Sequence, residues 1–277
     1  MTRRLLLLLA LMLVASPAMA APSARSITER FDLGGVTERG ARWSADELTV
    51  LNRTLSALDA RERRAIAGVT FVRSPRSPRV RESGLFKWDG EGRFIFVYSR
   101  AFDPHESGPN WTLVHEVGHA IAFWPFLAEQ RRLKSTIQKY NRAVESYNAL
   151  ISDYNAAATR YNRGRRAADK KALETLRPKV ARSGDRVAGM RASAMAAKRG
   201  LKSIKRRIKA RHPREGVLAA YRKVLGRKRA PTKYGRSNIR ESFSDALAMY
   251  HCDPRRLKEL LPKVHAWLAD GGHTRGL

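Results

Sequence analysis

Cysteine is nearly absent from this sequence of 277 residues, in which Cys252 is the only one. A chain with one cysteine has no internal disulfide, so its core must hold without covalent cross-links. We expect Cys252 to be a small buried residue near a helix end, the alternatives being an exposed thiol or pairing between chains. Long apolar runs are also scarce, because none follows the first twenty residues. The rest of the chain is therefore expected to be soluble, with one or two domains.

Acidic residues are few, since 25 Asp and Glu face 55 Lys and Arg, for a net charge of +30. The imbalance is concentrated between residues 131 and 230, where 30 basic and 6 acidic residues give +24. A field of that size attracts anionic partners. Nucleic acid, anionic lipid head groups and acidic envelope polymers all qualify, and charge alone does not choose among them.

The first twenty residues have the pattern of a secretory signal peptide. Arg3 and Arg4 precede an apolar run of ten residues, Leu5 to Val14, and Ala18 and Ala20 are the small residues that signal peptidase needs. A membrane anchor is the alternative, but the run is short for a bilayer. We therefore predict cleavage after Ala20 and export to the periplasm or the medium.

Hydrophobic periodicity predicts an α+β chain in three further parts. Residues 21–130 start with a loosely held arm over Ala21–Arg42, and a helix capped by Ser44 follows. The remaining elements expected there are a strand at Val69–Val72, a β-hairpin formed by Leu85–Trp88 and Phe94–Tyr98, and a helix over Trp111–Trp124 that Pro125 ends. Residues 216–277 should form helices, including one from about Asn238 to Tyr250.

Residues 131–215 show heptad spacing in two successive segments. Apolar residues follow steps of three and four from Leu133 to Tyr161 and again from Val187 to Ile208, which predicts two long helices paired as an antiparallel hairpin. Pro178 should start or kink the second helix. Tyr-Asn recurs every seven residues from Tyr140. We expect these tyrosines to pack in the seam, and a stacking surface for nucleic acid or glycan is the weaker alternative.

An HExxH motif spans residues 115–119, inside the helix predicted over Trp111–Trp124. Residues four apart lie on one helix face, so His115 and His119 can bind one Zn²⁺ ion. Glu116 is then placed beside the open position of the metal, where zinc lowers the pKa of a water. The motif therefore predicts two metal ligands and a general base.

A third ligand is needed, and the residues leave several candidates. They are a downstream carboxylate or one of the histidines His105, His212, His251, His265 and His273. Glu241 and Asp245 lie one turn apart on a predicted helix, so one can ligate zinc while the other holds an imidazole. Glu241 could instead complete a capping box with Asn238. Beside an HExxH helix, we favour the ligand.

The segment Tyr234-Gly-Arg-Ser-Asn, with Glu241 and then Asp245 after it, resembles the catalytic domain of anthrax lethal factor and its relatives. These proteins are gluzincins, zinc peptidases whose third ligand is a glutamate. The resemblance covers residues 111–124 and 231–250. It implies His115, His119 and Glu241 as ligands, Glu116 as base and Tyr234 as a donor to the oxyanion.

The chain departs from that family in having no recognisable toxin-delivery region and in the basic helices between its two motifs. We therefore expect a zincin-like α+β domain with a small, mainly antiparallel sheet and a helical-hairpin insertion. The expected function is peptide-bond hydrolysis with one Zn²⁺, acting on a peptide or protein. The alternative is a basic protein that binds an envelope polymer or another polyanion on a zincin scaffold with little or no catalysis.

Overall fold

The computed structural model describes residues 21–78, 82–88, 92–105, 107–208 and 216–275, so the predicted signal peptide and His212 lie outside the described residues. Four strands are present among these, namely β1 (Gly35–Glu38), β2 (Val69–Ser74), β3 (Gly84–Trp88) and β4 (Arg93–Tyr98). The helices are α1 (Ala24–Arg30), α2 (Ala45–Ala57), α3 (Ala60–Ile66), α4 (Pro109–Phe123), α5 (Leu127–Gly164), α6 (Ala167–Ile208), α7 (Gly216–Leu225), α8 (Ile239–Cys252), α9 (Pro254–Leu260) and α10 (Pro262–Ala269). Short 3-10 turns lie at Ser99–Phe102, Trp124–Phe126, Gly235–Ser237 and Gly272–Thr274.

The strands form one mixed sheet in the order β1-β2-β4-β3. The predicted hairpin of β3 and β4 is confirmed, with Phe86 opposite Ile95. The expectation of a mainly antiparallel sheet is wrong, because β1 pairs with β2 and β2 pairs with β4 in parallel. Strand β3 does not pair with β2, which precedes it in the chain. Strand β4 reverses the direction of β3 and inserts between β2 and β3, where it runs parallel to β2 and leaves β3 at the edge.

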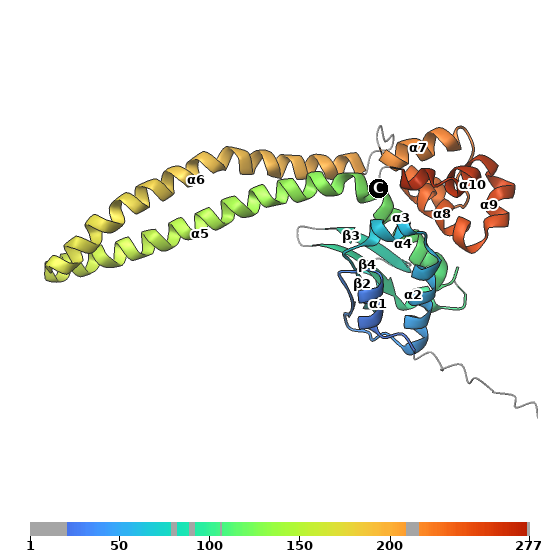
Figure 1. Cartoon of the computed structure of the whole chain (residues 1–277), viewed down its shortest axis with the longest axis horizontal. Coiled ribbons are helices and arrows are strands. Elements are labelled where there is room, and N and C mark those ends of the chain that lie inside the picture. Colours follow the sequence, from blue (N-terminus) through green and yellow to red (C-terminus); the bar gives the residue numbers. More distant parts are fainter. Residues whose placement is uncertain (1–20, 79–81, 89–91, 106, 209–215, 276–277) are drawn as a thin grey trace, which may run out of the picture.

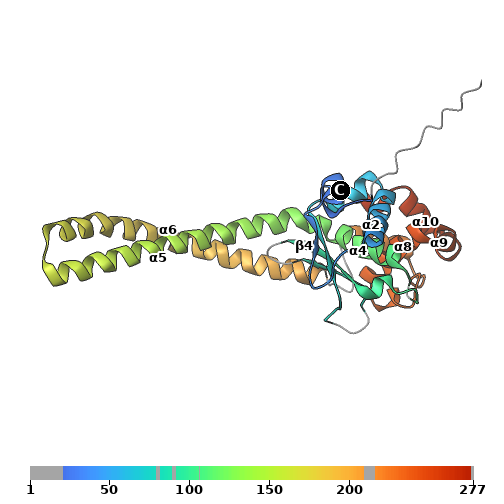
Figure 2. The ribbon, with the colours of Figure 1, turned by 90° about the horizontal axis from the view of Figure 1, so that it is seen from below.

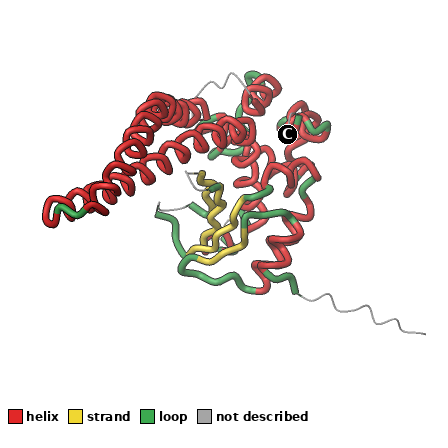
Figure 3. Tube along the Cα trace, turned by 60° about the vertical axis from the view of Figure 1, so that its left-hand side comes forward, coloured by secondary structure: helices red, strands yellow, loops and turns green. Residues whose placement is uncertain are grey.

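One face of this sheet packs into the main core. In β4, Ile95 and Val97 are fully buried, while Phe94 and Phe96 on the other face are only half-buried. The core continues into helices α2, α4 and α8, among others, and Figure 3 shows the strands packed beside helices of the body. Helix α4 is buried along most of its length, so the HExxH segment is held in the middle of the fold.

Helices α5 and α6 form the predicted antiparallel hairpin, which projects from the α+β body (Figures 1 and 2). Figure 2 shows the two helices crossing about halfway along their length. The seam is confirmed, because the repeated tyrosines are half-buried and the asparagines that follow them are exposed. Tyr147 packs closely on Gly184 of α6, which favours packing over a stacking surface. Pro178 lies inside α6 and does not start it.

Two smaller expectations are also corrected. The segment Ala21–Arg42 is not a loose arm, because it contains α1 and β1, and Ile27 of α1 is fully buried in the core. Cys252 is exposed at the last residue of α8, where the helix leaves the core. Ser44 caps α2, as predicted, and the structure adds that Glu47 completes a capping box with it. Within the described residues, no helix combines the length and the apolar composition needed to cross a membrane.

Buried charge joins the C-terminal region to α3. Oε1 of Glu62 accepts hydrogen bonds from Nε2 of His251 (2.9 Å) and Nε2 of His273 (2.8 Å). Oε2 of Glu62 accepts from the backbone N–H of Asp59. Burial alone would raise the pKa of Glu62, but the two histidine hydrogen bonds outweigh it and lower the pKa to about 2. We call Glu62, His251 and His273 the C-terminal clasp.

Candidate metal centre

Helices α4 and α8 pack closely at the point where the two sequence motifs meet. A Cβ atom on Gly118 would lie 2.9 Å from the Cα of Ser244, so only glycine permits this approach. The packing brings the HExxH face of α4 against the first turns of α8. Residues more than 120 positions apart in the sequence therefore share one buried site.

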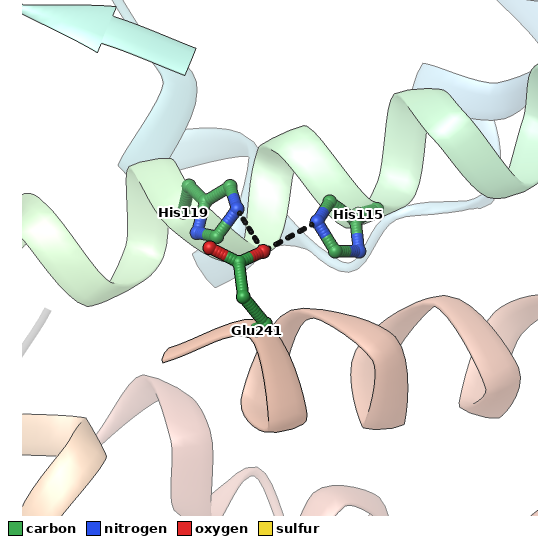
Figure 4. Close-up of side chains that lie close together, drawn as sticks. All are labelled: His115, His119 and Glu241. Carbon is green, nitrogen blue, oxygen red and sulfur yellow. Dashed lines mark hydrogen bonds and ion pairs between the residues drawn. The ribbon is translucent and has the colours of Figure 1, made fainter. Parts of the chain in front are cut away.

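His115, His119 and Glu241 point toward one another, as Figure 4 shows. Nε2 of His115 and Nε2 of His119 each lie 3.1 Å from Oε2 of Glu241. The other carboxylate oxygen, Oε1, accepts from the guanidinium of Arg240 at 3.0 Å. Asn238 caps α8 through its own side chain, but Glu241 faces the histidines and does not complete a capping box.

The three converging atoms suit a zinc ion. Zinc binds imidazole nitrogen and carboxylate oxygen at about 2.0–2.2 Å, so tetrahedral ligands lie about 3.3 Å apart. The observed separations of 3.1 Å are close to that value. Two histidines and a glutamate also match the ligand set of catalytic zinc sites, which keep a further position open.

The Nδ1 atoms of His115 and His119, the ring nitrogens that do not face Glu241 Oε2, both have partners on α8. Nδ1–H of His115 donates to Oδ1 of Asp245 (2.8 Å), as expected for an acidic residue that holds an imidazole. Nδ1 of His119 lies 3.0 Å from Oγ of Ser244. Such contacts hold each ring with Nε2 toward Glu241, which is the orientation that a metal-binding histidine needs. Sequence reasoning missed Ser244, although it lies three residues after Glu241 and so on the same side of the helix.

The pKa values of His115 and Glu241 are both shifted by the hydrogen bonds within the site. Burial alone would lower the pKa of His115, but hydrogen bonds to Asp245 and Glu241 raise it to about 10. Burial alone would raise the pKa of Glu241, but hydrogen bonds from His115 and His119 hold it well below its usual range. A metal that binds here must displace a proton from His115, so its affinity falls as the pH falls.

Glu116 lies on the same cleft but is not among the converging ligands. It is buried, and its Oε2 accepts the backbone N–H of Phe86 on the edge strand β3 at 2.5 Å. A Cβ atom on Gly84 would lie 2.8 Å from Cγ of Glu116, so glycine allows the strand to come this close. The sequence carries no signal for this contact, because it depends on how β3 meets α4.

Tyr234 lies at the rim of the cleft and is 61% exposed. Its ring centroid is 5.8 Å from that of His115. Partial burial, and then the negative charges of Glu241 and Glu116, raise the pKa of Tyr234 to about 12. The hydroxyl therefore keeps its proton near neutral pH and can donate a hydrogen bond.

The loop that carries Tyr234 is tied to the metal centre by a short chain of hydrogen bonds. The Thr232 hydroxyl donates to Oδ2 of Asp245, and the backbone N–H of Gly235 donates to that hydroxyl at 2.9 Å. Asp245 thus orients both His115 and the loop before α8. Thr232 was not identified from the sequence.

The other histidines proposed as ligands lie elsewhere. His251 and His273 belong to the C-terminal clasp, and His265 packs on Tyr250 with ring centroids 5.5 Å apart. His105 is exposed, in a loop. In the described part of the chain, one other group of potential ligands converges, formed by Asp59, Glu62 and His273. The 2.8 Å contact of His273 with Glu62 there is a direct hydrogen bond, which the clasp explains.

We expect Ser244→Ala to weaken zinc binding about tenfold, since partners of ligating histidines contribute about 10–100-fold in affinity. The substitution removes the partner of His119 Nδ1 and keeps the small size that lets α4 and α8 meet. Competition with a chromogenic chelator measures the change. Ser146→Ala, on the exposed side of α5, is the control. Equal affinities for the two variants would show that Ser244 does not support the ligand.

The chain matches no family model, no curated protein and no solved structure.

Proposed function

We propose that the protein is an exported zinc metalloendopeptidase of the gluzincin type, built on a zincin-like α+β domain. The observation that carries the proposal is the convergence of His115, His119 and Glu241 on one point, with Glu116 on the same cleft. A zinc ion in this donor set would act as a Lewis acid on the scissile carbonyl and lower the pKa of a water.

Residues of the chain itself would transfer the protons, stabilise the developing negative oxygen and orient the imidazoles. Glu116 is positioned to take a proton from the attacking water and to deliver it to the leaving amine. The N–H of Phe86 holds one of its carboxylate oxygens and so fixes its orientation. Tyr234 is positioned to donate a hydrogen bond to the oxygen that becomes negative in the transition state. Asp245 and Ser244 hold the two imidazoles.

A peptide is the substrate class that the cleft favours. The cleft has a volume of about 620 Å³, and the whole of β3 lines one side of it. Strand β3 is an edge strand, and its Phe86 N–H donates to Glu116 in the cleft, so the outward side of the strand borders the cleft. An extended peptide can pair with such an edge through its main chain, independently of its sequence.

Metal analysis together with chelation tests this proposal. We expect the purified protein to contain one zinc per chain and to cleave peptides in a mixed library. Removal of zinc with a chelator should abolish cleavage, and added Zn²⁺ should restore it. Glu241→Gln should lower zinc affinity by about 100-fold, because it replaces a charged carboxylate with a neutral amide, and Glu145→Gln on the exposed side of α5 should not.

A wild-type protein without stoichiometric zinc, or full cleavage by the chelated protein, would overturn the proposal.

The second candidate function would then gain support. It is the binding of an anionic polymer or surface, and the observation that favours it is the net charge of +24 in residues 131–230, most of which form the projecting hairpin. The two functions are compatible, because the metal centre and most of the hairpin are separate in space.

A further inference from the structure

One end of the cleft is built from residues that the proposed chemistry does not use. Trp88 of β3 and Phe123 of α4 lie with ring centroids 4.6 Å apart. Nζ of Lys205, on α6, is 5.6 Å from the centroid of the Trp88 ring. All three residues line the cleft that contains the metal centre. Phe123 follows His119 by four residues, so this end lies one helical turn beyond the second ligand.

The helix segment that carries Lys205 is held in place by the packing of neighbouring residues at the root of the hairpin, and the Lys205 side chain itself is exposed. Ile204 is fully buried in a cluster with Phe123, Phe126 and Leu127. The guanidinium of Arg207 lies 5.1 Å from the ring centroid of Phe126 and pairs with Glu129 at the start of α5. The hairpin is therefore anchored to the body at this point, and its last turns place the backbone of Lys205 beside the cleft, with Nζ near the Trp88 ring.

The charges around the cleft give this end a distinct character. Four carboxylates line the cleft, and each of them has a partner. Glu241 faces the histidines, Asp245 holds His115, Glu116 accepts the N–H of Phe86, and Glu82 accepts the hydroxyl of Ser77. The nearby cation Arg240 is paired with Glu241. Lys205 instead stands beside aromatic rings. Such a pocket suits a side chain with an apolar stem and a negative end, since the stem can lie on the rings while the end meets the ammonium group.

We propose that the root of the hairpin forms a specificity subsite that takes an acidic side chain of the peptide substrate. The inference rests on the proposed peptidase function and names the class of substrate. It gives the insertion a role at the cleft itself, because Lys205 comes from α6 while Trp88 and Phe123 come from the body. Glutamate should fit better than aspartate, because its longer stem can lie across the Trp88 ring.

Cleavage of a peptide library by the full-length, zinc-loaded protein tests the subsite. We expect cleaved ends to be enriched about tenfold in Glu and Asp at one position near the scissile bond. Lys205→Glu should abolish the enrichment and shift it toward Lys and Arg, because the new carboxylate repels an acidic side chain. Arg206→Glu is the matched control, since it makes the same charge change at an exposed position on the same helix that does not line the cleft.

Binding gives a second readout that does not depend on turnover. The zinc-loaded Glu116→Gln protein should bind a peptide with a central Glu about tenfold more tightly than the same peptide with Gln, and Lys205→Glu in that background should remove the difference. Arg206→Glu should keep it. Equal binding of the two peptides, or equal effects of the two charge reversals, would overturn the subsite. A wild type that cleaves nothing but binds acidic peptides through Lys205 would contradict the peptidase proposal and leave the subsite supported.

Discussion

Glu116→Gln is expected to lower kcat/KM for peptide hydrolysis by about 10²–10⁴-fold, the usual contribution of a general base. The amide cannot accept a proton from water, yet it has almost the size and shape of the carboxylate. Its oxygen can still accept the N–H of Phe86, so strand β3 and helix α4 should stay in place. The measurement is the rate of cleavage of a peptide that the wild type hydrolyses.

The zinc content of the variant separates chemistry from metal loss. Glu116 is not among the three converging ligands, so Glu116→Gln should keep one zinc per chain. Glu174→Gln, at an exposed position of α6, controls for the loss of one negative charge. A zinc-loaded Glu116→Gln protein that cleaves at the wild-type rate would show that another group is the base.

Glu62→Gln is expected to cost about 3 kcal/mol of unfolding free energy at pH 7. This cost follows from the pKa of Glu62, which is lowered from 4.5 to about 2 in the folded protein. The carboxylate accepts from His251 and His273 on one oxygen and from the N–H of Asp59 on the other. An amide can accept on one side only, so its NH₂ group must face a donor. Urea denaturation measures the difference.

The difference in stability between wild type and Glu62→Gln should decrease as the pH falls. A carboxyl group whose pKa is lower in the folded state stabilises the fold fully above its unfolded value of about 4.5. That contribution is lost as the pH falls through about 2, so wild type and Glu62→Gln should approach each other in acid. Glu259→Gln, at an exposed ion pair with Arg256, should change stability by less than about 0.5 kcal/mol. Equal stability of Glu62→Gln and wild type at pH 7 would mean that the clasp does not hold the C-terminal region.

The sequence predicts how the two helices of the hairpin pair and that their surface is positive, but not how the hairpin meets the body. The heptad spacing predicts how α5 and α6 pair, and the composition predicts a positive surface. Neither predicts that Ile204 is buried beside Phe123 and Phe126, or that Lys205 therefore lies at the cleft. The distal part of the hairpin remains available for an anionic surface, while its root belongs to the cleft.

Local patterns predicted most of the elements because each depends on neighbours in the chain. The cap at Ser44, the antiparallel pairing of β3 with β4, the end of α4 near Pro125 and the two heptad seams are of this kind. The parallel pairs of the sheet were not predicted. Strand β4 pairs with β2, from which β3 separates it in the sequence, and a pattern within one segment does not contain that pairing. The segment before Ser44 was also missed, since its polar composition hides the one residue that α1 buries, Ile27.

The sequence by itself determined which residues were candidates for the metal centre, because the HExxH spacing places His115 and His119 on one helix face and Glu241 precedes Asp245 by one turn. Only the tertiary structure showed which of the other candidates lies beside the histidine pair, because it brings Oε2 of Glu241 to 3.1 Å from both imidazoles and directs His251 and His273 to Glu62. The physical reason is the contact of Gly118 with Ser244. How closely two helices pack depends on side chains far apart in the sequence, and periodicity within either helix does not contain that information.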